Sequence, residues 1–378
     1  MYKTFFAFLL FAIIANNQVV VSIEPDMHEI LQNINAKLYK ENEKIPFDSI
    51  PQLHNDKFFF TAFDEIAQML DGRRNINLKR AIFLVEWAYL KGRLDYADYC
   101  SQIDIIVSKL NSFIDKNKIR GYKTCTNAAL FEFFTKTNDL NDSIPFLYDP
   151  IDPGGRKDIQ KTFVTKLLKT HTGQCSSFHL LYKILCNELG GTAYLTHAPN
   201  HLFITHPNEL GEIINIELTT GTFHNTEIYI ETLGISKRAI KNGVFLRGWN
   251  EKEDIAYALN LLAEVYFFKY KAYDTFTFIC SQKILRFVPN FCLALSMQEC
   301  TLNQWGYDYV QIHGKKPSSY INIIDSEHKR LIKLMEDLGF SSLTAQEYIN
   351  NVDNLYKRTG KEPSESWLKF KKYNNQVE

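Results

Sequence analysis

The stretch THTGQCSSFHLLYKILCNELGGTAYLTHAPNHLFI, residues 170–204, changes its hydrophobic period halfway along. Apolar residues at helical spacing follow Cys175 and end at Gly190 and Gly191, which predicts an amphipathic helix with a glycine stop. The runs TAYLTHAP, HLFITH and, after the turn sequence HPNELG, EIINIELT are short and rich in β-branched and aromatic residues, as strands are. A helix that leads directly into antiparallel strands predicts an α+β core.

Helical patterns flank this core on both sides. Upstream, LKRAIFLVEWAYLKG and DYADYCSQIDIIVSKLNSFI have apolar residues at helical spacing, and the turn-rich loop SIPFLYDPIDPGGRKD separates them from the core. We therefore expect four regions: a leader at 1–22, an N-terminal helical region at 23–140, the α+β core at 141–250 and a C-terminal helical region at 251–378. The core begins with a helix expected from about 158 to 169.

The C-terminal region contains a pattern that is typical of a tetratricopeptide hairpin. Leu262, Ala263 and Tyr266 stand where that repeat has a large, a small and an aromatic residue, and Pro289 closes the hairpin. Residues 326–358 predict two further amphipathic helices. One such hairpin with additional helices offers a surface for a protein or peptide partner.

The first 22 residues have the pattern of a secretory signal peptide. Lys3 supplies a positive start, and Phe5 to Ile14 form an apolar segment that is too short to span a bilayer. Ala15 and Ser22 are both candidate cleavage sites, and an uncleaved anchor lengthened by Val19–Val21 is the alternative. We expect an exported protein, periplasmic or extracellular, with no membrane span after this segment.

Charge and cysteine usage exclude several classes of function. The 378 residues include 43 Lys and Arg and 43 Asp and Glu, and this balance gives no support for a nucleic-acid partner. A hydrophobic content of 45% argues against a disordered chain. The seven cysteines include no C-x-x-C pair, so the sequence predicts neither a zinc site nor a redox pair of this type. No cofactor is expected.

Cys175 is the candidate nucleophile in the opening stretch. It stands at the predicted start of a helix, where the helix dipole and unpaired backbone N–H groups stabilise a thiolate. The same N–H groups can donate to an oxyanion that forms on an attacked carbonyl. A buried thiol with no chemical role is the alternative, because cysteines are common in protein interiors.

A nucleophilic thiol needs a base, and the stretch offers His171, His179, His197 and His201. His179 lies one helical turn beyond Cys175, where packing is the more usual role. His201 opens the second strand, so its side chain can face back to the helix start. Strand alternation places His201, Phe203 and Thr205 on one face and Leu202 and Ile204 on the other.

An imidazole base is held in place by an acceptor on its other ring nitrogen. The segment GEIINIELTTG offers Asn215 and Glu217, which are two residues apart and therefore share one face of a strand. Both are candidates for this role. A metal site built from Cys175, His197 and His201 is the competing use of these residues, but the two histidines do not share a helical face, so we predict no metal.

The order of Cys, strand-initiating His and acid resembles the transglutaminase-like, papain-related superfamily. The longer run PFLYDPIDPGGRKDIQKTFVTKLLKTHTGQCSSFHLLYKIL, together with AYLTHAPNHLFI and NIELTTG, is similar to exported bacterial transglutaminase-like proteins of unassigned activity. The resemblance covers most of the chain from about residue 60. It implies a transglutaminase/papain-like core, in which a Cys-bearing helix packs on an antiparallel sheet, between N-terminal helices and a tetratricopeptide-like region.

The resemblance implies a catalytic role for three residues: Cys175 as nucleophile, His201 as general acid and base, and Glu217 as the orienting acceptor. Glu stands where the family usually has Asp, and Gln174 precedes the thiol where many transglutaminases have another residue. We expect a thiol enzyme that hydrolyses peptide or amide bonds of a protein or peptide substrate. The alternative is a catalytically silent protein that binds a partner through its C-terminal helices.

Overall fold

The N-terminal part of the fold is a group of capped helices. The computed structural model describes residues 54, 56–315, 318–360, 362–363, 367–368 and 371–372, so the leader expected at 1–22 and its cleavage site lie outside the described residues. The first four helices of the described residues are α3 (Lys57–Asp71), α4 (Leu78–Tyr89), α5 (Tyr96–Lys116) and α6 (Cys125–Thr135). The side chains of Asp56, Asn77 and Asp95 accept hydrogen bonds from the first turns of α3, α4 and α5, as N-cap residues do.

The segment before the candidate nucleophile is irregular. It contains η2 (Asp139–Asn141), β1 (Leu147–Tyr148), η3 (Pro153–Gly155), η4 (Ile159–Thr162), α7 (Val164–Thr170) and β2 (Thr172–Gly173). The single helix expected at 158–169 is broken, because Phe163 is extended. The carboxylate of Glu86, from α4, accepts hydrogen bonds from the N–H groups of Val164 (2.6 Å) and Thr165 (3.0 Å), so a distant residue starts α7.

The sheet is antiparallel with strand order β3-β4-β5-β6, and α8 (Cys175–Glu188) precedes it. The strands are β3 (Tyr194–Ala198), β4 (His201–Pro207), β5 (Ile213–Glu217) and β6 (Thr222–His224). Leu202, Ile204 and Ile216 are buried in the same hydrophobic cluster as the apolar face of α8. The α+β class, the helix at Cys175 and the three strands predicted from the sequence are confirmed.

Two tight turns fix the strands. Asn200, between β3 and β4, has a left-handed backbone (φ 54°), which asparagine tolerates better than most residues. Between β4 and β5, the side chain of Asn208 accepts hydrogen bonds from the N–H groups of Leu210 and Glu212, and Gly211 has φ 87°. This second turn sets a register in which Thr205 lies opposite Asn215.

The remaining elements are α9 (Thr226–Thr232), α10 (Lys237–Lys241), α11 (Glu251–Tyr270), α12 (Thr275–Phe287), α13 (Cys292–His313), α14 (Ser319–Leu338) and α15 (Ala345–Thr359). The predicted helical hairpin is α11 and α12. Helix α13 is not among the helices predicted from the sequence, and α14 begins earlier than the expected 326. Within the part of the chain that is described, no helix is both long and apolar enough to cross a bilayer.

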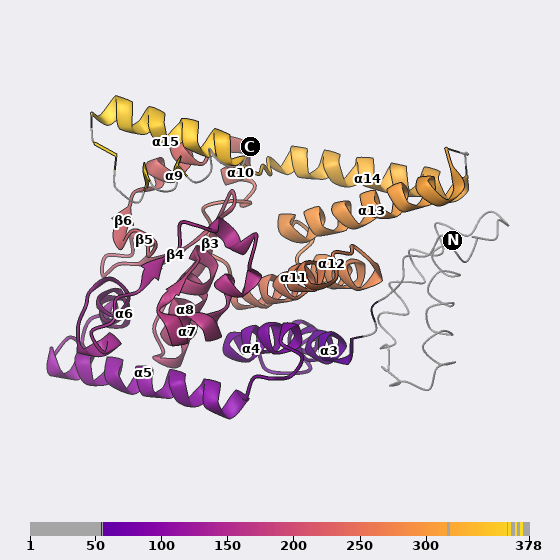
Figure 1. Ribbon diagram of the computed structural model, residues 1–378. Helices are drawn as coiled ribbons and strands as arrows, with labels where there is room; N and C mark the ends of the chain where they lie inside the picture. The colour runs from indigo at the N-terminus through magenta and orange to yellow at the C-terminus, as the bar shows by residue number, and fades with distance from the viewer. Residues whose placement is uncertain are drawn as a thin grey trace.

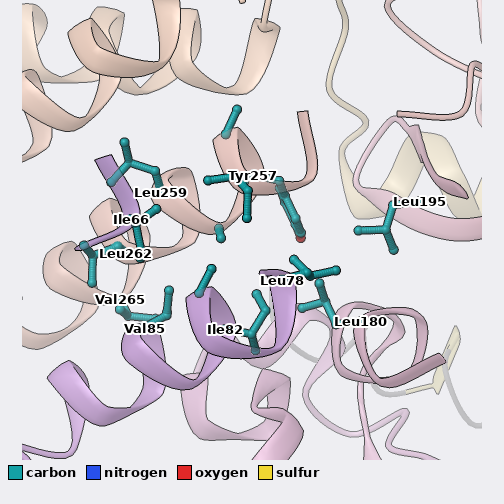
Figure 2. Close-up of a cluster of buried hydrophobic side chains, with 14 of the residues drawn as sticks. Ile66, Leu78, Ile82, Val85, Leu180, Leu195, Tyr257, Leu259, Leu262 and Val265 are labelled. Atoms are coloured by element: carbon teal, nitrogen blue, oxygen red, sulfur yellow. The ribbon is translucent and has the colours of Figure 1, made fainter. Parts of the chain in front are cut away.

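Figure 1 shows the N-terminal helices, the α+β core and the C-terminal helices. One hydrophobic cluster has members in all three. Figure 2 shows part of it, where Ile66 and Ile82 from the N-terminal helices meet Leu180 from α8 and Leu259 from α11. A smaller cluster, called the second cluster below, lies beside the sheet and consists of Ala198, Phe203, Tyr229, Leu233, Ile235, Ala239 and Phe245. The first cluster therefore packs against the apolar face of α8, and the second cluster lies next to His201.

Candidate active site

Cys175 is the first residue of α8 and is half-buried. The fully buried side chain of Gln174, the residue before it, turns away from the helix: it donates to the carbonyl of Asp149 (2.7 Å) and accepts from the N–H of Gly154 (2.9 Å). In the first turn of α8, the hydroxyl of Ser177 accepts from the N–H of Gln174 (3.0 Å), which is one half of a capping box. The thiol is therefore held beside backbone N–H groups at the positive end of the helix dipole.

His201, the first residue of β4, connects the thiol to a carboxylate. Its Nε2 lies 2.6 Å from Oε2 of Glu217. Its side chain makes a further hydrogen bond with Cys175, for which the other ring nitrogen remains. The structure thus brings together Cys175, His201 and Glu217, the three residues on which the resemblance places the chemistry.

Glu217 is almost completely buried, with 3% of its surface exposed, and both carboxylate oxygens have donors. Oε2 accepts from His201 and from the hydroxyl of Tyr229 (3.0 Å), and Oε1 accepts from the N–H (3.1 Å) and hydroxyl (2.6 Å) of Thr219. Burial alone raises the pKa of a carboxyl group, but the charge of His201 and these hydrogen bonds hold the pKa of Glu217 well below its usual range. Glu217 is therefore a carboxylate at neutral pH.

The same contacts act in the opposite direction on the imidazole. Burial lowers the pKa of a histidine, yet the charge of Glu217 and the hydrogen bonds to Cys175 and Glu217 together raise the pKa of His201 to about 10. His201 is therefore an imidazolium at neutral pH.

Asn215, the other candidate for the orienting role, faces the same side of β5 but contacts different groups. Its amide donates to the carbonyl of His224 (3.0 Å) and to the hydroxyl of Thr226 (3.2 Å). Because Asn215 pairs with Thr205, it lies about 7 Å farther along the strand than Glu217, at ~3.3 Å per residue. The register, which the sequence pattern alone does not fix, leaves Glu217 as the residue beside His201.

The other three histidines of the opening stretch have structural contacts. His179 is fully buried: its Nδ1 lies 2.6 Å from the carbonyl of Cys175, its Nε2 accepts from the N–H of Leu218 (3.3 Å), and burial lowers its pKa to about 4. It ties the start of α8 to the end of β5. His171 stacks on Phe146, and His197 packs between Phe245 and Trp249.

Two tyrosines near the site were not identified from the sequence. Tyr229 of α9 donates to Glu217, as described above. Tyr148 of β1 pairs with Gly173, two residues before the thiol, and its pKa is raised by burial and by the charge of Cys175. Neither residue stands in a recognisable local pattern, because each reaches the site through a contact that is distant in the sequence.

Outside this site, the thiol of Cys300 donates to the carboxylate of Glu299 (3.5 Å), which also lies 2.6 Å from Nε2 of His328, but burial and the charge of Glu299 raise the pKa of Cys300 to about 11. All seven cysteines are free, and Cys186, the other thiol of the opening stretch, is fully buried with its pKa raised by burial to about 12. Among the residues that the structure describes, no cluster of three or more His, Cys, Asp and Glu side chains is arranged to hold a metal ion.

Comparison with protein-family models, curated proteins and solved structures found no match to this chain.

Proposed function

We propose that the protein is a thiol enzyme that hydrolyses peptide or amide bonds through Cys175, His201 and Glu217. The observation that carries this proposal is the position of the His201 ring, which is hydrogen-bonded to the thiol on one side and to a buried carboxylate on the other. Nucleophile, base and orienting group in this sequence of contacts are what nucleophilic catalysis requires.

The reaction proceeds in two steps, formation of a thioester on Cys175 and its hydrolysis. The Cys175 sulfur attacks the substrate carbonyl, and backbone N–H groups at the start of α8 stabilise the negative oxygen that forms. The C–N bond then breaks while the imidazolium of His201 gives its proton to the leaving amine, which leaves a thioester. Neutral His201 next removes a proton from water, the resulting hydroxide attacks the thioester, and the acid product leaves as the sulfur is released.

The fold is consistent with the resemblance to the transglutaminase-like superfamily. The resemblance implies a helix that begins at the cysteine and packs on an antiparallel sheet. The strands of that sheet carry the histidine and the acid, as β4 and β5 do here. The tetratricopeptide-like assignment of the C-terminal region is part of the same proposal. Its support is the packed pair α11 and α12, in which Leu262, Ala263 and Tyr266 are all fully buried.

The test is the rate at which iodoacetamide alkylates Cys175 at pH 7, measured by mass mapping of the peptide that contains it. We expect Cys175 to react faster than Cys125, which is also half-buried and also opens a helix, but whose described contacts include no histidine. His201→Ala should lower the Cys175 rate by about 10² to 10⁴, the usual contribution of an acid–base group, while the Cys125 rate stays unchanged.

A peptidyl electrophile should label the native protein and fail to label Cys175→Ala. If the native Cys175 instead reacts no faster than Cys125, the thiol is not activated. The proposal would then give way to a protein that binds its partner without catalysis.

A further inference from the structure

The C-terminal helix α15 lies alongside α9, next to the sheet that carries the candidate site (Figure 1). The side-chain amide of Asn351 in α15 donates to the carbonyl of Thr232 (3.1 Å), and the guanidinium of Arg358 pairs with the carboxylate of Glu231. More than a hundred residues of sequence separate α15 from α9. These two contacts hold α15 beside α9, the helix that carries Tyr229. The hydroxyl of Tyr229 donates to Glu217.

The segment that leads into α15 is also attached to the site. The side-chain amide of Asn200, the residue directly before His201, donates to the carbonyl of Leu343. Phe340 and Leu343 pack against the second cluster. At the end of α14, Asn242 donates to the carbonyl of Leu338 (3.1 Å). The turn that presents His201 is therefore bonded directly to the chain that positions α15.

Tyr348 of α15 extends this attachment to the catalytic groups. Its ring packs against the second cluster, where the rings of Phe203 and Tyr229 stack next to His201 with centroids 6.2 and 6.1 Å away. Trp367 contacts Tyr348 edge-on at 5.7 Å. Burial raises the pKa of Tyr348, and the charges of Glu217 and Cys175 raise it further, so its hydroxyl lies in the electrostatic field of both groups.

We propose that Tyr348 is a specificity-determining wall of the site: with α15 docked, only narrow acyl groups reach Cys175, and bulky substrates enter when α15 is displaced. This rests on the proposed function only in naming Cys175 as the reacting atom. The wall is a part of the C-terminal helical region, so a partner that binds α15 would change which substrates are accepted. Access to the thiol is thus controlled from outside the α+β core.

The test compares two reagents of one chemistry at Cys175: iodoacetamide, which is small, and iodoacetamide coupled to dextran, which is bulky. The quantity of interest is the ratio of the bulky to the small rate, because activation of the thiol affects both rates equally and cancels. Tyr348→Ala should raise this ratio at least about tenfold, equivalent to ~1.4 kcal/mol of closure. Tyr348→Phe, which keeps the ring, should leave the ratio unchanged.

Tyr356→Ala is the matched control, because Tyr356 is a half-buried tyrosine of the same helix that also packs near Trp367. It should leave the ratio at the native value. An equal rise in Tyr348→Ala and Tyr356→Ala would show that loosening of α15 in general, and not the Tyr348 wall, admits the reagent. An unchanged ratio in Tyr348→Ala would overturn the proposal.

A pair of glycine variants tests the docking of α15 without changing any side chain near the site. Gly339, which ends α14, has φ 83°, and a Cβ there would lie 2.7 Å from the backbone nitrogen of Ala239 in α10. Gly360, which ends α15, has φ 65° and no atom within 4 Å of a Cβ. Gly339→Ala should therefore lift the lead into α15 and raise the ratio, whereas Gly360→Ala carries similar backbone strain and should not.

The two proposals fail in different ways. If iodoacetamide reacts slowly with Cys175 in every variant while the bulky-to-small ratio still rises in Tyr348→Ala and Gly339→Ala, the wall is present and the enzyme proposal is wrong. If Cys175 is highly reactive and neither variant changes the ratio, the enzyme proposal stands and the wall is wrong.

Discussion

Glu217 connects more groups of the site than any other side chain described above. Its two oxygens bind His201, Tyr229 and both donors of Thr219, which come from β4, α9 and the chain after β5. A buried carboxylate with four donors cannot turn without leaving several of them unpaired, and each unpaired buried group costs about 1–3 kcal/mol. The orientation of the His201 ring is therefore fixed by the rest of the site.

Glu217→Gln tests this orienting role. The amide can accept only through its oxygen, so either His201 or Thr219 meets an NH₂ group in place of an acceptor, and the charge that favours the imidazolium is lost. We expect iodoacetamide to react with Cys175 about 10²-fold more slowly, at the low end of the range for acid–base groups. The measurement is the Cys175 alkylation rate at pH 7.

Asn215→Ala is the control for that variant, because Asn215 faces the same side of β5 but bonds to His224 and Thr226. Its alkylation rate should remain within about twofold of the native rate, even where the loss of two hydrogen bonds lowers stability. A comparable slowing in both variants would indicate a general distortion of the strand and would remove the case for a specific role of Glu217.

At the scale of single elements, α7 shows how a helix can begin at a residue that the local sequence does not mark. Its first two N–H groups bond to the carboxylate of Glu86, which is buried in α4. Burial raises the pKa of Glu86 to about 7, against the effect of these hydrogen bonds. The position of α7, and with it the short strand β2 that leads to Cys175, therefore depends on one side chain from the N-terminal helices.

Glu86→Ala should lower the free energy of unfolding by about 1–3 kcal/mol, because two buried N–H groups lose their acceptors. Urea denaturation followed by circular dichroism measures this change. Glu188→Ala offers a comparison, since Glu188 forms a partly exposed ion pair with Lys79 and such pairs contribute about 0–1 kcal/mol. Equal losses in the two variants would show that Glu86 does not cap α7.

The elements that the sequence predicts well are those whose pattern depends on neighbours along the chain. Alternation in HLFITH and EIINIELT gives β4 and β5, and the helical spacing after Cys175 gives α8. The break at Phe163 could not be predicted, because Glu86, 78 residues from Val164, causes it. The sequence also could not predict which of Asn215 and Glu217 lies beside His201. Both share one face of the strand, and only the pairing with β4 distinguishes them.

At the scale of the whole molecule, the α+β core and the flanking helices share one hydrophobic interior. Leu262 of α11 is fully buried in it, in the region where Figure 2 shows α11 facing Ile66, Ile82 and Val85. Because the regions share one interior, they should unfold together. A substitution that destabilises α11 should therefore also lower the stability of α8. The same arrangement brings Tyr229 of α9 and Tyr348 of α15 to the site. No local sequence pattern predicts this position for either tyrosine.

Leu262→Ala should destabilise the entire chain by about 2–5 kcal/mol, the usual cost of such a cavity. Two probes should shift together in urea: the circular dichroism of the helices and the exposure of Cys186, which is fully buried in α8, to a pulse of iodoacetamide. Leu210→Ala, at a side chain that is 84% exposed, should change neither by more than about 0.5 kcal/mol. If the circular dichroism shifts and Cys186 does not, the regions unfold separately.

The turn from Asn208 to Glu212 has a consequence for how this chain could diverge. Its length sets the register of β5 against β4, and a strand that slips by one residue presents every side chain to the opposite face. A single inserted or deleted residue in this turn would turn Asn215 and Glu217 to the face on which Ile214 and Ile216 now lie, or force a bulge to prevent it. A descendant could thus lose the acid of its site while keeping Cys175, His201 and Glu217 unchanged in its sequence, so the length of this turn is as informative about chemistry as the three residues themselves.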